Sequence, residues 1–290
     1  MVVGKIIGGL GNQMFQFVFY KYLSELKCIE LYLDVNSFEG YKLHNGYELD
    51  KVFNINQSFA SAHNVKQLKS SFDFLFRVEN KMFNKNYLFG ATHYKENKFR
   101  IDKDLFLQNK PNFYVEGYFQ TCMYALQLKK DVKKIFSFNT MLDNKERVLI
   151  EKKTSVSIHI RGGDYLQNQK DKKLFGDICN YEYYKESIEF IRLKIDNPAF
   201  IVFSDDSDYA EKMMNGVKFT LVNWNKDENS YRDMFLMSQC KHNIIANSSF
   251  SWWGAYLNIN SDKIVIAPKK WFNNTRISQK LIVPAEWIRM

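Results

Sequence analysis

The segment Ser155-Val-Ser-Ile-His-Ile-Arg-Gly-Gly-Asp-Tyr165 gives the strongest indication of fold in this chain. Apolar residues recur at every second position from Val156 onward, and this period of two is typical of a β-strand. Gly162 and Gly163 follow, and glycine lets the backbone turn sharply and approach a ligand closely. The segment therefore predicts a strand over 155–161 that ends in a glycine turn.

The turn places Arg161 and Asp164 where the carboxyl end of a strand meets a loop. In an open α/β sheet, ligands bind at that edge. The planar guanidinium group can hold two oxygens of a phosphate at once, so Arg161 is a candidate ligand for an oxyanion. The alternative is a surface loop in which Arg161 pairs with Asp164, an exposed ion pair of small energetic value.

Strand and helix patterns alternate on both sides of this segment, from about residue 143 to residue 267. Such alternation predicts a parallel sheet with helices on both of its faces. The predicted strands are 155–161, 199–204, 217–222, 243–246 and 263–267, and the predicted helices are 143–152, 181–195, 207–214, 229–239 and 251–258.

The first half of the chain also opens like a Rossmann unit. Residues 2–7 and 31–35 read as strands, and 13–27 reads as the helix between them. Residues 36–110 are aromatic, rich in Asn and irregular, with helical stretches near 62–84, and their order is not predicted. A strand at 112–117 and a helix at 121–136 complete this half.

A chain of 290 residues suits two domains. We place the boundary in the polar stretch from Ser137 to Asn144, which gives domains at 1–142 and 143–290. Apolar residues make up 46% of the sequence, enough for two cores, so disorder is excluded. The predicted fold class is α/β with two Rossmann-like domains facing a cleft.

The four cysteines, the N-terminus and the hydropathy bear on the compartment. The cysteines contain no C-x-x-C pair, which argues against a zinc site and fits free thiols in a reducing compartment. We find no charged-then-apolar leader and no run of about 20 apolar residues, and we therefore expect a cytosolic protein.

The net charge of +9 allows nucleic acid, an anionic membrane or a phosphorylated small molecule as a partner. No RNA-binding pattern is evident. The local lysine cluster predicts a solvated helix face, with weak peripheral membrane contact as the alternative. The cluster consists of Lys129, Lys130, Lys133 and Lys134.

Three segments together resemble the α-1,2-fucosyltransferases of glycosyltransferase family 11. They are Gly8–Gln16, His159–Tyr165 and Asn247–Tyr256, with shorter matches at Gly117–Gln120 and Phe203–Asp206. They occur in family order across nearly the whole chain. The typical bacterial form of the second segment is His-Ile-Arg-Arg-Gly-Asp-Tyr, so Gly162 stands in place of a second arginine. This removes a cation that the family pattern places beside the donor.

The resemblance implies a GT-B-like architecture and an inverting transfer of L-fucose from GDP-β-L-fucose to a glycan hydroxyl. The expected acceptor atom is O2 of a terminal galactose, and no metal or other cofactor is implied. Residues 1–142 would form the acceptor side and 143–290 the GDP-fucose-binding side. The remaining site residues follow from the motifs one by one.

The segment Gly9-Leu-Gly11-Asn-Gln-Met14 nearly spells the dinucleotide-binding fingerprint, and Asp34 lies where a ribose-binding acid is expected. Met14 replaces the third glycine, so a NAD-dependent oxidoreductase remains a rival. The resemblance instead makes the glycines a loop lining the cleft, with Asn12 and Gln13 aimed at the bound sugar. A purely structural turn is the alternative.

The segment Asn247-Ser-Ser-Phe-Ser251 lies between a predicted strand and a predicted apolar helix. A helix start leaves backbone N–H groups without partners, and these donors suit a phosphate. With Arg161 on a neighbouring strand, a pyrophosphate could be held from two sides. Ordinary helix capping explains the serines equally well. The candidate donor contacts here are Ser248, Ser249, Phe250 and Ser251.

Carboxylates after the next strand allow either metal or nucleotide binding. Asp206-Ser-Asp208 and Asp102-Lys-Asp104 both fit the pattern Asp-x-Asp, which many glycosyltransferases use for a divalent ion. The resemblance needs no metal, because arginine and helix-start donors can supply the electrostatics. Asp205 and Asp206 are then interpreted as nucleotide-side contacts, or as a helix cap.

For guanine, Asp233 is the candidate carboxylate by resemblance, with His159 as an added contact. Asp233 could equally be a helix-surface acid paired with Arg232 or a nearby lysine, and His159 a polar residue of the core.

Inversion also calls for a base, and Asp164 is the first choice because it shares a loop with Arg161. Asp34 and Glu116 are alternatives. A non-catalytic glycan- or RNA-binding protein is the remaining rival, since the loss of an arginine at Gly162 can indicate decayed catalysis.

Overall fold

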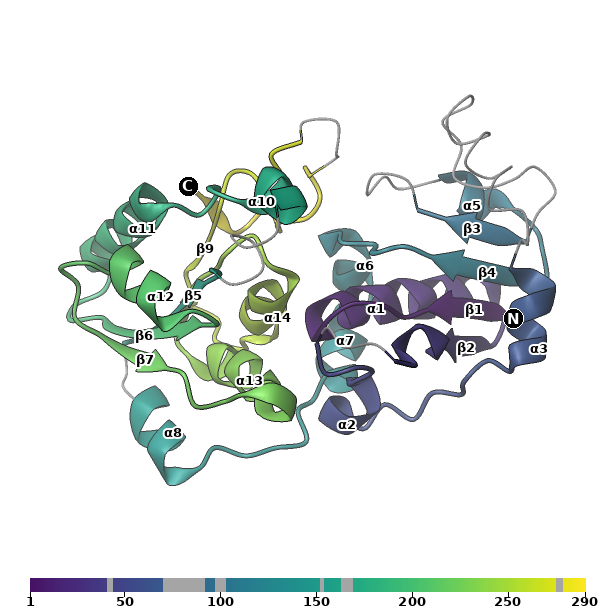
Figure 1. Ribbon diagram of the computed structural model, residues 1–290, viewed down its shortest axis with the longest axis horizontal. Helices are drawn as coiled ribbons and strands as arrows, with labels where there is room; N and C mark the ends of the chain where they lie inside the picture. Colours follow the sequence, from purple (N-terminus) through teal and green to yellow (C-terminus); the bar gives the residue numbers. More distant parts are fainter. Residues whose placement is uncertain (41–43, 70–91, 97–102, 152–153, 163–168, 275–278) are drawn as a thin grey trace. The chain divides into compact units, whose positions relative to one another are not determined.

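The structure, a computed structural model, describes residues 1–290 except 41–43, 70–91, 97–102, 152–153, 163–168 and 275–278 (Figure 1). The chain forms two units. The first comprises Met1–Ser137 with Arg276–Leu281, and the second comprises Phe138–Thr275 with Ile282–Met290. The backbone N–H of Cys122 donates to Leu281 O at 2.7 Å, so a segment near the end of the chain packs with the first unit.

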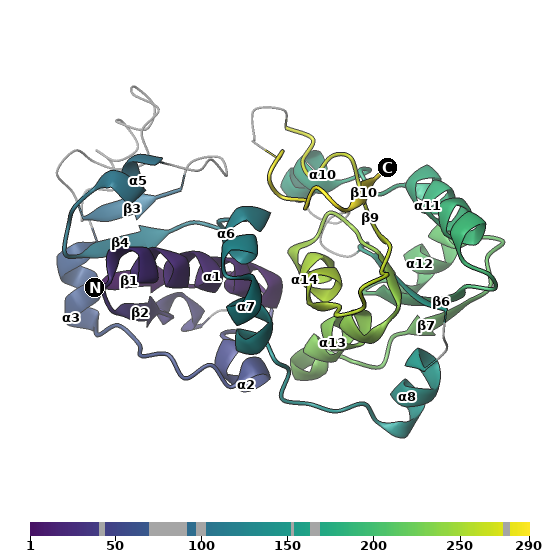
Figure 2. The same ribbon diagram turned by 180° about the vertical axis from the view of Figure 1, so that it is seen from behind.

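The first unit is built on a parallel sheet with the strand order β2-β1-β4-β3 (Figures 1 and 2). Its strands are β1 (Val2–Lys5), β2 (Leu31–Asp34), β3 (His93–Lys95) and β4 (Phe113–Glu116). Its helices are α1 (Leu10–Lys27), α2 (Leu49–Phe53), α3 (Ala62–Leu68), α5 (Lys103–Leu107), α6 (Cys122–Gln127) and α7 (Lys129–Ile135), with a 3₁₀ turn at Asn36–Phe38.

Helix α1 is fixed to this sheet by its apolar side chains. Most of its residues from Leu10 to Leu23 are buried, which fits the broad apolar coverage of its sequence. Tyr20 packs directly over β1, and its hydroxyl donates to Lys5 O at 2.7 Å. A Cβ at Gly4 would lie 2.2 Å from the Tyr20 ring, so this close approach requires glycine. Burial of this face supplies most of the stabilisation of the helix.

The second unit is a six-stranded parallel sheet with the order β10-β9-β8-β5-β6-β7. Its strands are β5 (Ser155–Ile160), β6 (Ala199–Ser204), β7 (Phe219–Val222), β8 (His242–Ile244), β9 (Val265–Ala267) and β10 (Ile288–Arg289). Its helices are α8 (Asn144–Ile150), α10 (Gln169–Phe175), α11 (Tyr181–Lys194), α12 (Ser207–Met213), α13 (Tyr231–Gln239) and α14 (Ser249–Leu257), with a 3₁₀ turn at Asp227–Asn229.

Both faces of this sheet are buried. Along β6, Phe200 and Val202 pack in one core with α11 and α12, whereas Ile201 and Phe203 pack in the other core with α8 and α13. Successive side chains of a strand point to opposite faces, so a run of apolar residues such as 199–203 requires helices on both sides. The predicted doubly covered parallel sheet is therefore confirmed.

In each sheet, the chain first adds a strand on one side of the first strand and later returns to add a strand on its other side. In the second unit the chain passes from β5 to β6 and β7 on one side, and then returns to place β8 on the other side of β5. In the first unit β1 lies between β2 and β4 in the same way. Open α/β sheets bind ligands at the carboxyl ends of the strands that flank such a switch point. The sites are therefore expected after β1 and β4, and after β5 and β8.

Some predicted elements differ from those observed. The single helix predicted at 121–136 is two helices, because Leu128 leaves the helical conformation with φ −92° and ψ 23°. The helix predicted from Gln13 begins earlier, at Leu10, so Gly11 and Asn12 belong to its first turn. Strand β3 and helix α10 were not predicted, since both are short and lie in segments without a clear period.

The buried amide of Asn243 in β8 gives a test of the second sheet. Its Nδ2 donates to Ser157 Oγ at 2.7 Å and to Met237 O at 2.8 Å, and its Oδ1 accepts from Asn258 at 2.8 Å. Asn243→Ala leaves these groups unpaired in the interior and should lower the free energy of unfolding by about 2–4 kcal/mol. Urea denaturation measures this loss. Thr220→Ala, at an exposed position of β7, serves as the control and should change stability by less than about 0.5 kcal/mol.

Candidate functional site

Arg161 follows the last residue of β5 and pairs with Asp205, which follows the last residue of β6. Arg161 Nη1 lies 2.9 Å from Asp205 Oδ2. The backbone N–H of Gly162 donates to Asp205 Oδ1 at 3.0 Å. Because β5 and β6 are adjacent parallel strands, one carboxylate holds both the Arg161 side chain and the turn behind it.

The Arg161–Asp205 ion pair is open to solvent, since 26% and 30% of the two side chains are exposed. An exposed pair of this kind contributes only about 0–1 kcal/mol. A diphosphate carries more charge than one carboxylate and can accept two parallel hydrogen bonds from a guanidinium. Asp205 therefore orients the Arg161 side chain. Transfer of the guanidinium from Asp205 to an anionic ligand would cost little free energy, because the exposed ion pair is weak.

Gly162 is tightly enclosed. A Cβ at this position would lie 2.9 Å from Asp206 Cβ and 3.0 Å from Tyr209 Cδ1. The first contact is with an atom attached directly to the backbone, which can move only if the start of α12 moves. A side chain at this position, such as the second arginine of the resembled pattern, would therefore clash with the start of α12.

His159, near the end of β5, connects this edge to the start of α14. Its side chain is buried, and its ring centroid lies 6.0 Å from that of Phe250. Burial lowers the pKa of His159 to about 3, with the nearby Arg161 charge as a second cause, so the imidazole is neutral at physiological pH. Its Nδ1 atom is buried and has no hydrogen-bond partner among the described residues. Such atoms are rare in folded proteins, so this nitrogen is a candidate ligand contact.

The predicted phosphate turn is the N-terminus of α14. Ser248 caps the helix, because its Oγ accepts from the Phe250 N–H at 3.3 Å. Ser251 is fully buried, and its hydroxyl is directed at the carbonyl oxygens of Ala246 and Ser248. Ser249 is the first residue of the helix. Capping and burial therefore account for the hydroxyls of Ser248 and Ser251, and a phosphate would approach the backbone of this turn.

The other predicted carboxylates on this unit have structural partners. Asp206 caps α12, since its Oδ1 accepts from the Tyr209 N–H at 2.9 Å. Asp233 lies in the first turn of α13 and accepts from Asn225 at 2.8 Å. Burial raises the pKa of Asp233 to about 7. The interpretation that Asp233 pairs with Arg232 is wrong, because Arg232 pairs with Glu146. Asp164 lies outside the described residues, and its predicted role stays a prediction.

In the first unit, the glycine turn after β1 meets the loop after β4. Gln120 Nε2 donates to Asn12 Oδ1 at 2.7 Å, and Gln16 Nε2 donates to Gly117 O at 3.0 Å. Gly8 adopts φ +78°, which favours glycine, and Gly9 precedes α1. Two segments of the family pattern, far apart in sequence, therefore lie together at this switch point.

Gln13 is buried and fully used in folding. Its Nε2 donates to Gly8 O at 2.9 Å and to Gly46 O at 2.7 Å, while its Oε1 accepts from the Glu48 N–H at 2.9 Å. Asn12, one residue earlier on α1, is the partner of Gln120. Gln13 and Asn12 were both predicted to face the sugar. The Gln13 amide is instead bonded to the backbone around the glycine turn, next to Asn12.

The two carboxylates considered as alternative bases are both engaged. Glu116 contacts Lys5 Nζ and Lys95 Nζ at 3.1 Å each, and His93 Nε2 at 3.2 Å. These hydrogen bonds and cations outweigh burial and hold the pKa of Glu116 well below its usual range. Asp34 is buried and accepts the Tyr114 hydroxyl at 2.6 Å. Glu116 is therefore not suited to take a proton at neutral pH, and the Asp34 carboxylate is bound within the core.

Sequence reasoning missed Glu96, which directly follows β3 at this same edge. Its Oε2 accepts the backbone N–H groups of Tyr118 and Phe119 at 2.7 and 3.0 Å. Burial raises the pKa of Glu96 to about 7. In the sequence, Glu96 is marked only by its place between His93-Tyr94 and the segment at 117–120, and this signal was too weak to single it out.

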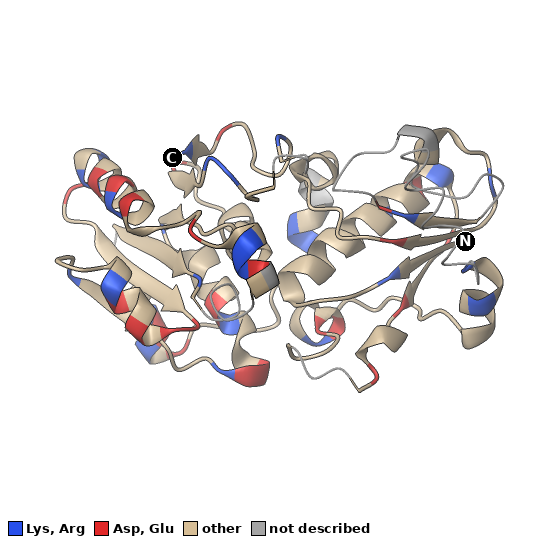
Figure 3. Ribbon diagram, turned by 45° about the horizontal axis from the view of Figure 1, so that its top comes forward, with Lys and Arg blue, Asp and Glu red and all other residues tan. Residues whose placement is uncertain are grey.

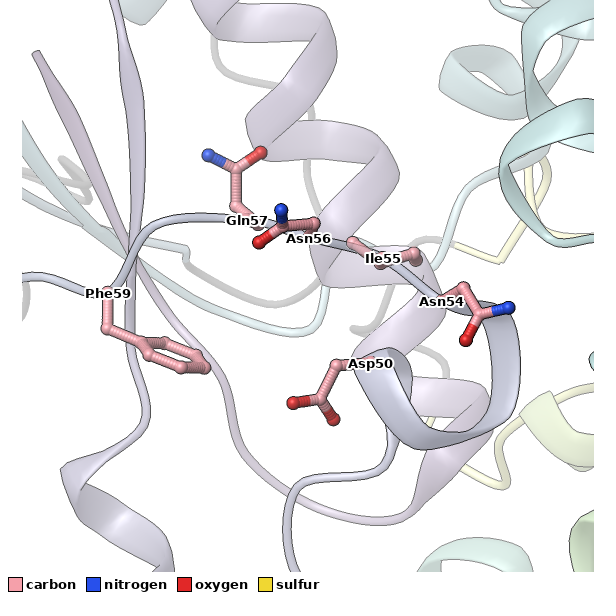
Figure 4. A pocket seen from close by; sticks show the side chains of 6 residues that line it. All are labelled: Asp50, Asn54, Ile55, Asn56, Gln57 and Phe59. Atoms are coloured by element: carbon pink, nitrogen blue, oxygen red, sulfur yellow. The ribbon is translucent and has the colours of Figure 1, made fainter.

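Two hollows lie away from these edges. One, of about 270 Å³, borders α2 in the first unit, with the Phe59 ring and the Asp50 carboxylate on either side (Figure 4). The other, of about 480 Å³, is lined by Ala199 and Phe219 at the amino ends of β6 and β7, together with Arg192. In a parallel sheet this is the end opposite to Arg161. The lining residues of the two hollows include none of the predicted site residues.

Lys and Arg residues are spread over both units and interspersed with acids, rather than gathered in one basic stripe (Figure 3). Within the described ranges, no group of three or more His, Cys, Asp or Glu side chains is arranged to hold a metal ion. Asp102 lies outside those ranges, so the predicted independence from metal stays a prediction. None of the described helices combines the length and apolar character needed to cross a membrane.

Comparison with known proteins assigns the class and then the family. The fold resembles that of an Arabidopsis thaliana FUT1 mutant in complex with GDP, with a TM-score of 0.53 and 14% identity over 99% of this chain and 75% of that chain. This confirms the predicted α/β, GT-B-like fold. The family description "Glycosyl transferase family 11" matches residues 5–290, and the chain belongs to that family.

Two relatives from Escherichia coli span the whole chain. An α-1,2-colitosyltransferase is 35% identical over 294 residues, which cover 100% of this chain and 99% of the relative. The O-antigen biosynthesis glycosyltransferase WbnK is 34% identical over 300 residues, which cover 98% of each. The family assignment places the chain among glycosyltransferases and not among nicotinamide-dependent oxidoreductases.

The enclosure of Gly162 predicts a cost for any side chain there. Gly162→Ala should lower the free energy of unfolding of the second unit by about 1–3 kcal/mol, because the start of α12 must shift to admit the methyl group. Chemical denaturation measures the change, and Asn215→Ala, at an exposed position beyond α12, is the control. An unchanged midpoint for Gly162→Ala would show that α12 moves without cost.

Proposed function

We propose that this chain transfers L-fucose from GDP-β-L-fucose to O2 of a terminal galactose in a glycan, with inversion and without a metal ion. Membership of glycosyltransferase family 11 supports glycosyl transfer. The α-1,2 linkage is supported by the name of the colitosyltransferase relative. The second unit would hold GDP and the first unit would hold the acceptor.

The single observation that carries this proposal is the position of Arg161 at the switch point of the second sheet. β5 and β8 are neighbours, so Arg161 and the start of α14 follow the carboxyl ends of adjacent strands. The His159–Phe250 ring contact joins the same two elements. A guanidinium and helix-start N–H groups are the donors that stabilise a diphosphate leaving group in the absence of a cation. His159, Asp205 and Asp233 are proposed to contact the nucleotide.

The donor sugar has a second candidate. Colitose is fucose without its 3-hydroxyl group, and the colitosyltransferase relative is 35% identical to this chain. A site that hydrogen-bonds the 3-hydroxyl would reject colitose strongly, whereas a site that leaves it in solvent would discriminate little. GDP-fucose and GDP-colitose should therefore be compared side by side.

A direct assay tests the reaction. The protein should release GDP from GDP-fucose or GDP-colitose only when a β-galactoside acceptor is present, and EDTA should leave the rate unchanged. Mass spectrometry and NMR of the product identify the α-1,2 linkage. GDP release that requires Mg²⁺ or Mn²⁺ would contradict the metal-free mechanism. Binding of glycan without any consumption of donor would favour the non-catalytic rival.

Removal of the proposed phosphate ligand should affect the transition state. Arg161→Ala should lower kcat/KM by about 100-fold or more, which corresponds to about 3 kcal/mol, because charge develops on the departing diphosphate. The matched control is Arg192→Ala, which removes an exposed arginine near the amino ends of the same sheet and should be neutral. Activity of Arg161→Ala within tenfold of the unmodified protein would exclude this role.

A further inference from the structure

Glu96 is bound by the turn at 117–120, which also contacts the Gly8–Gln16 segment. Its backbone N–H donates to Glu116 O at 2.9 Å, which continues the pairing of β3 with β4 by one residue. Its carboxylate lies at the turn after β4, where Oε2 accepts the backbone N–H groups of Tyr118 and Phe119. Through Gln120 this turn is bonded to Asn12. The carboxylate of Glu96 is therefore fixed beside the switch point of the first sheet.

The backbone of the turn is shaped to receive this carboxylate. A Cβ at Gly117 would lie 2.4 Å from Glu96 Cβ and 2.8 Å from Glu96 Oε2, so glycine is required there. Phe119 adopts φ +49°, which is uncommon for a residue with a side chain. Its ring stacks on Phe19 with centroids 3.8 Å apart, which holds that conformation in place. Backbone strain of this kind is found where the surrounding structure fixes a functional geometry.

Only one of the two carboxylate oxygens of Glu96 is used in this arrangement. Among the described residues, Oε1 makes no hydrogen bond, while Oε2 takes both backbone N–H groups. The side chain is partly buried rather than enclosed. The group therefore combines a fixed position, an oxygen left for a further hydrogen bond, and a desolvated site that favours uptake of a proton.

Among the described residues, the cations near this edge pair with Glu116 and not with Glu96. Lys5, Lys95 and His93 all contact Glu116, and Asp34 is bonded to Tyr114. On α1, Glu96 faces the phenol of Tyr20, whose pKa is raised well above its usual range by burial first and by Glu96, Glu116 and Asp34 next. At this edge one carboxylate takes the cations and stays ionised, whereas burial raises the pKa of Glu96 to about 7.

We propose that Glu96 is the general base of the transfer, acting on the hydroxyl group of an acceptor bound at the carboxyl edge of the first sheet. This inference rests on the proposed function. The acceptor oxygen forms a bond to the anomeric carbon of the donor sugar while the bond from that carbon to the phosphate oxygen breaks. The bonding electron pair leaves with GDP, and the acceptor proton passes to Glu96 Oε1.

The alternative is that Glu96 only clasps the 117–120 turn. Glu96→Gln separates the two roles, because the amide oxygen can still accept both N–H groups but cannot take a proton at neutral pH. A general base contributes about 10²–10⁴-fold to rate. We therefore expect kcat of Glu96→Gln to fall by about 100-fold or more. The melting temperature and the Kd for GDP should stay close to those of the unmodified protein.

The pH profile gives a second readout. A base acts when it is deprotonated, so kcat/KM of the unmodified protein should rise about tenfold per pH unit up to a pKa near 7 and then level off. Glu96→Gln should lose this limb, while Glu96→Asp should keep it at a reduced rate. The limb should survive in Glu96→Gln if it belongs to Asp233, whose pKa is also about 7. Glu25→Gln, an exposed carboxylate on α1, is the matched control and should change nothing.

Each result decides one question. If the unmodified protein consumes no nucleotide sugar, the proposed function fails and the assignment of Glu96 fails with it. If the protein is active but Glu96→Gln keeps its rate within fivefold, or keeps the acid limb, then Glu96 is not the base and the transferase function stands. If Glu96→Gln loses activity only in proportion to a lower melting temperature, Glu96 is a structural clasp and the proposal is overturned.

Discussion

The strand order of the two sheets is the constraint on which both proposed sites depend. In each sheet a later strand returns to pair with the first strand on the side not yet occupied, β4 beside β1 and β8 beside β5. Backbone hydrogen bonds of the parallel ladder then fix the register, and the turns after the two strands come side by side. A different strand order would separate Gln120 from Asn12, and His159 from Phe250, without changing any of these residues.

Much of this arrangement could be predicted from the sequence where a period was strong. Strand β6 was predicted at its observed limits because its apolar run is bounded by Pro198 on one side and by Asp205 on the other. Helix α11 begins at the predicted residue, Tyr181, where Asn180 caps it, and it ends one residue before the predicted end. The position of Arg161 and of the Asn247–Ser251 turn at the carboxyl ends of strands was also predicted, because each lies at or directly after the end of a predicted strand. Strand order itself was not predicted, as it depends on contacts between residues that are far apart in the chain.

The parts that sequence reasoning missed are those that depend on partners distant in sequence. Glu116 seemed available as a base, but Lys5 and Lys95 approach it from neighbouring strands. Glu96 was not singled out because, among the described residues, its carboxylate bonds to a turn more than 20 residues later in the sequence. Short elements add to the difficulty, since the three residues of β3 cannot display a period. In each case the local sequence gives the residue type, while the sheet determines its environment.

The position of Gly162 bears on whether the departure from the family pattern reflects loss of activity. A side chain lost by drift leaves its space vacant or filled by solvent, because the surrounding structure relaxes only in part. Here Asp206 Cβ and Tyr209 Cδ1 lie 2.9 and 3.0 Å from the position of a Cβ, and the Gly162 N–H donates to Asp205. The same Asp205 orients Arg161. The turn is thus closely packed around glycine and still presents Arg161 at the edge, which favours the proposed donor site over a decayed one.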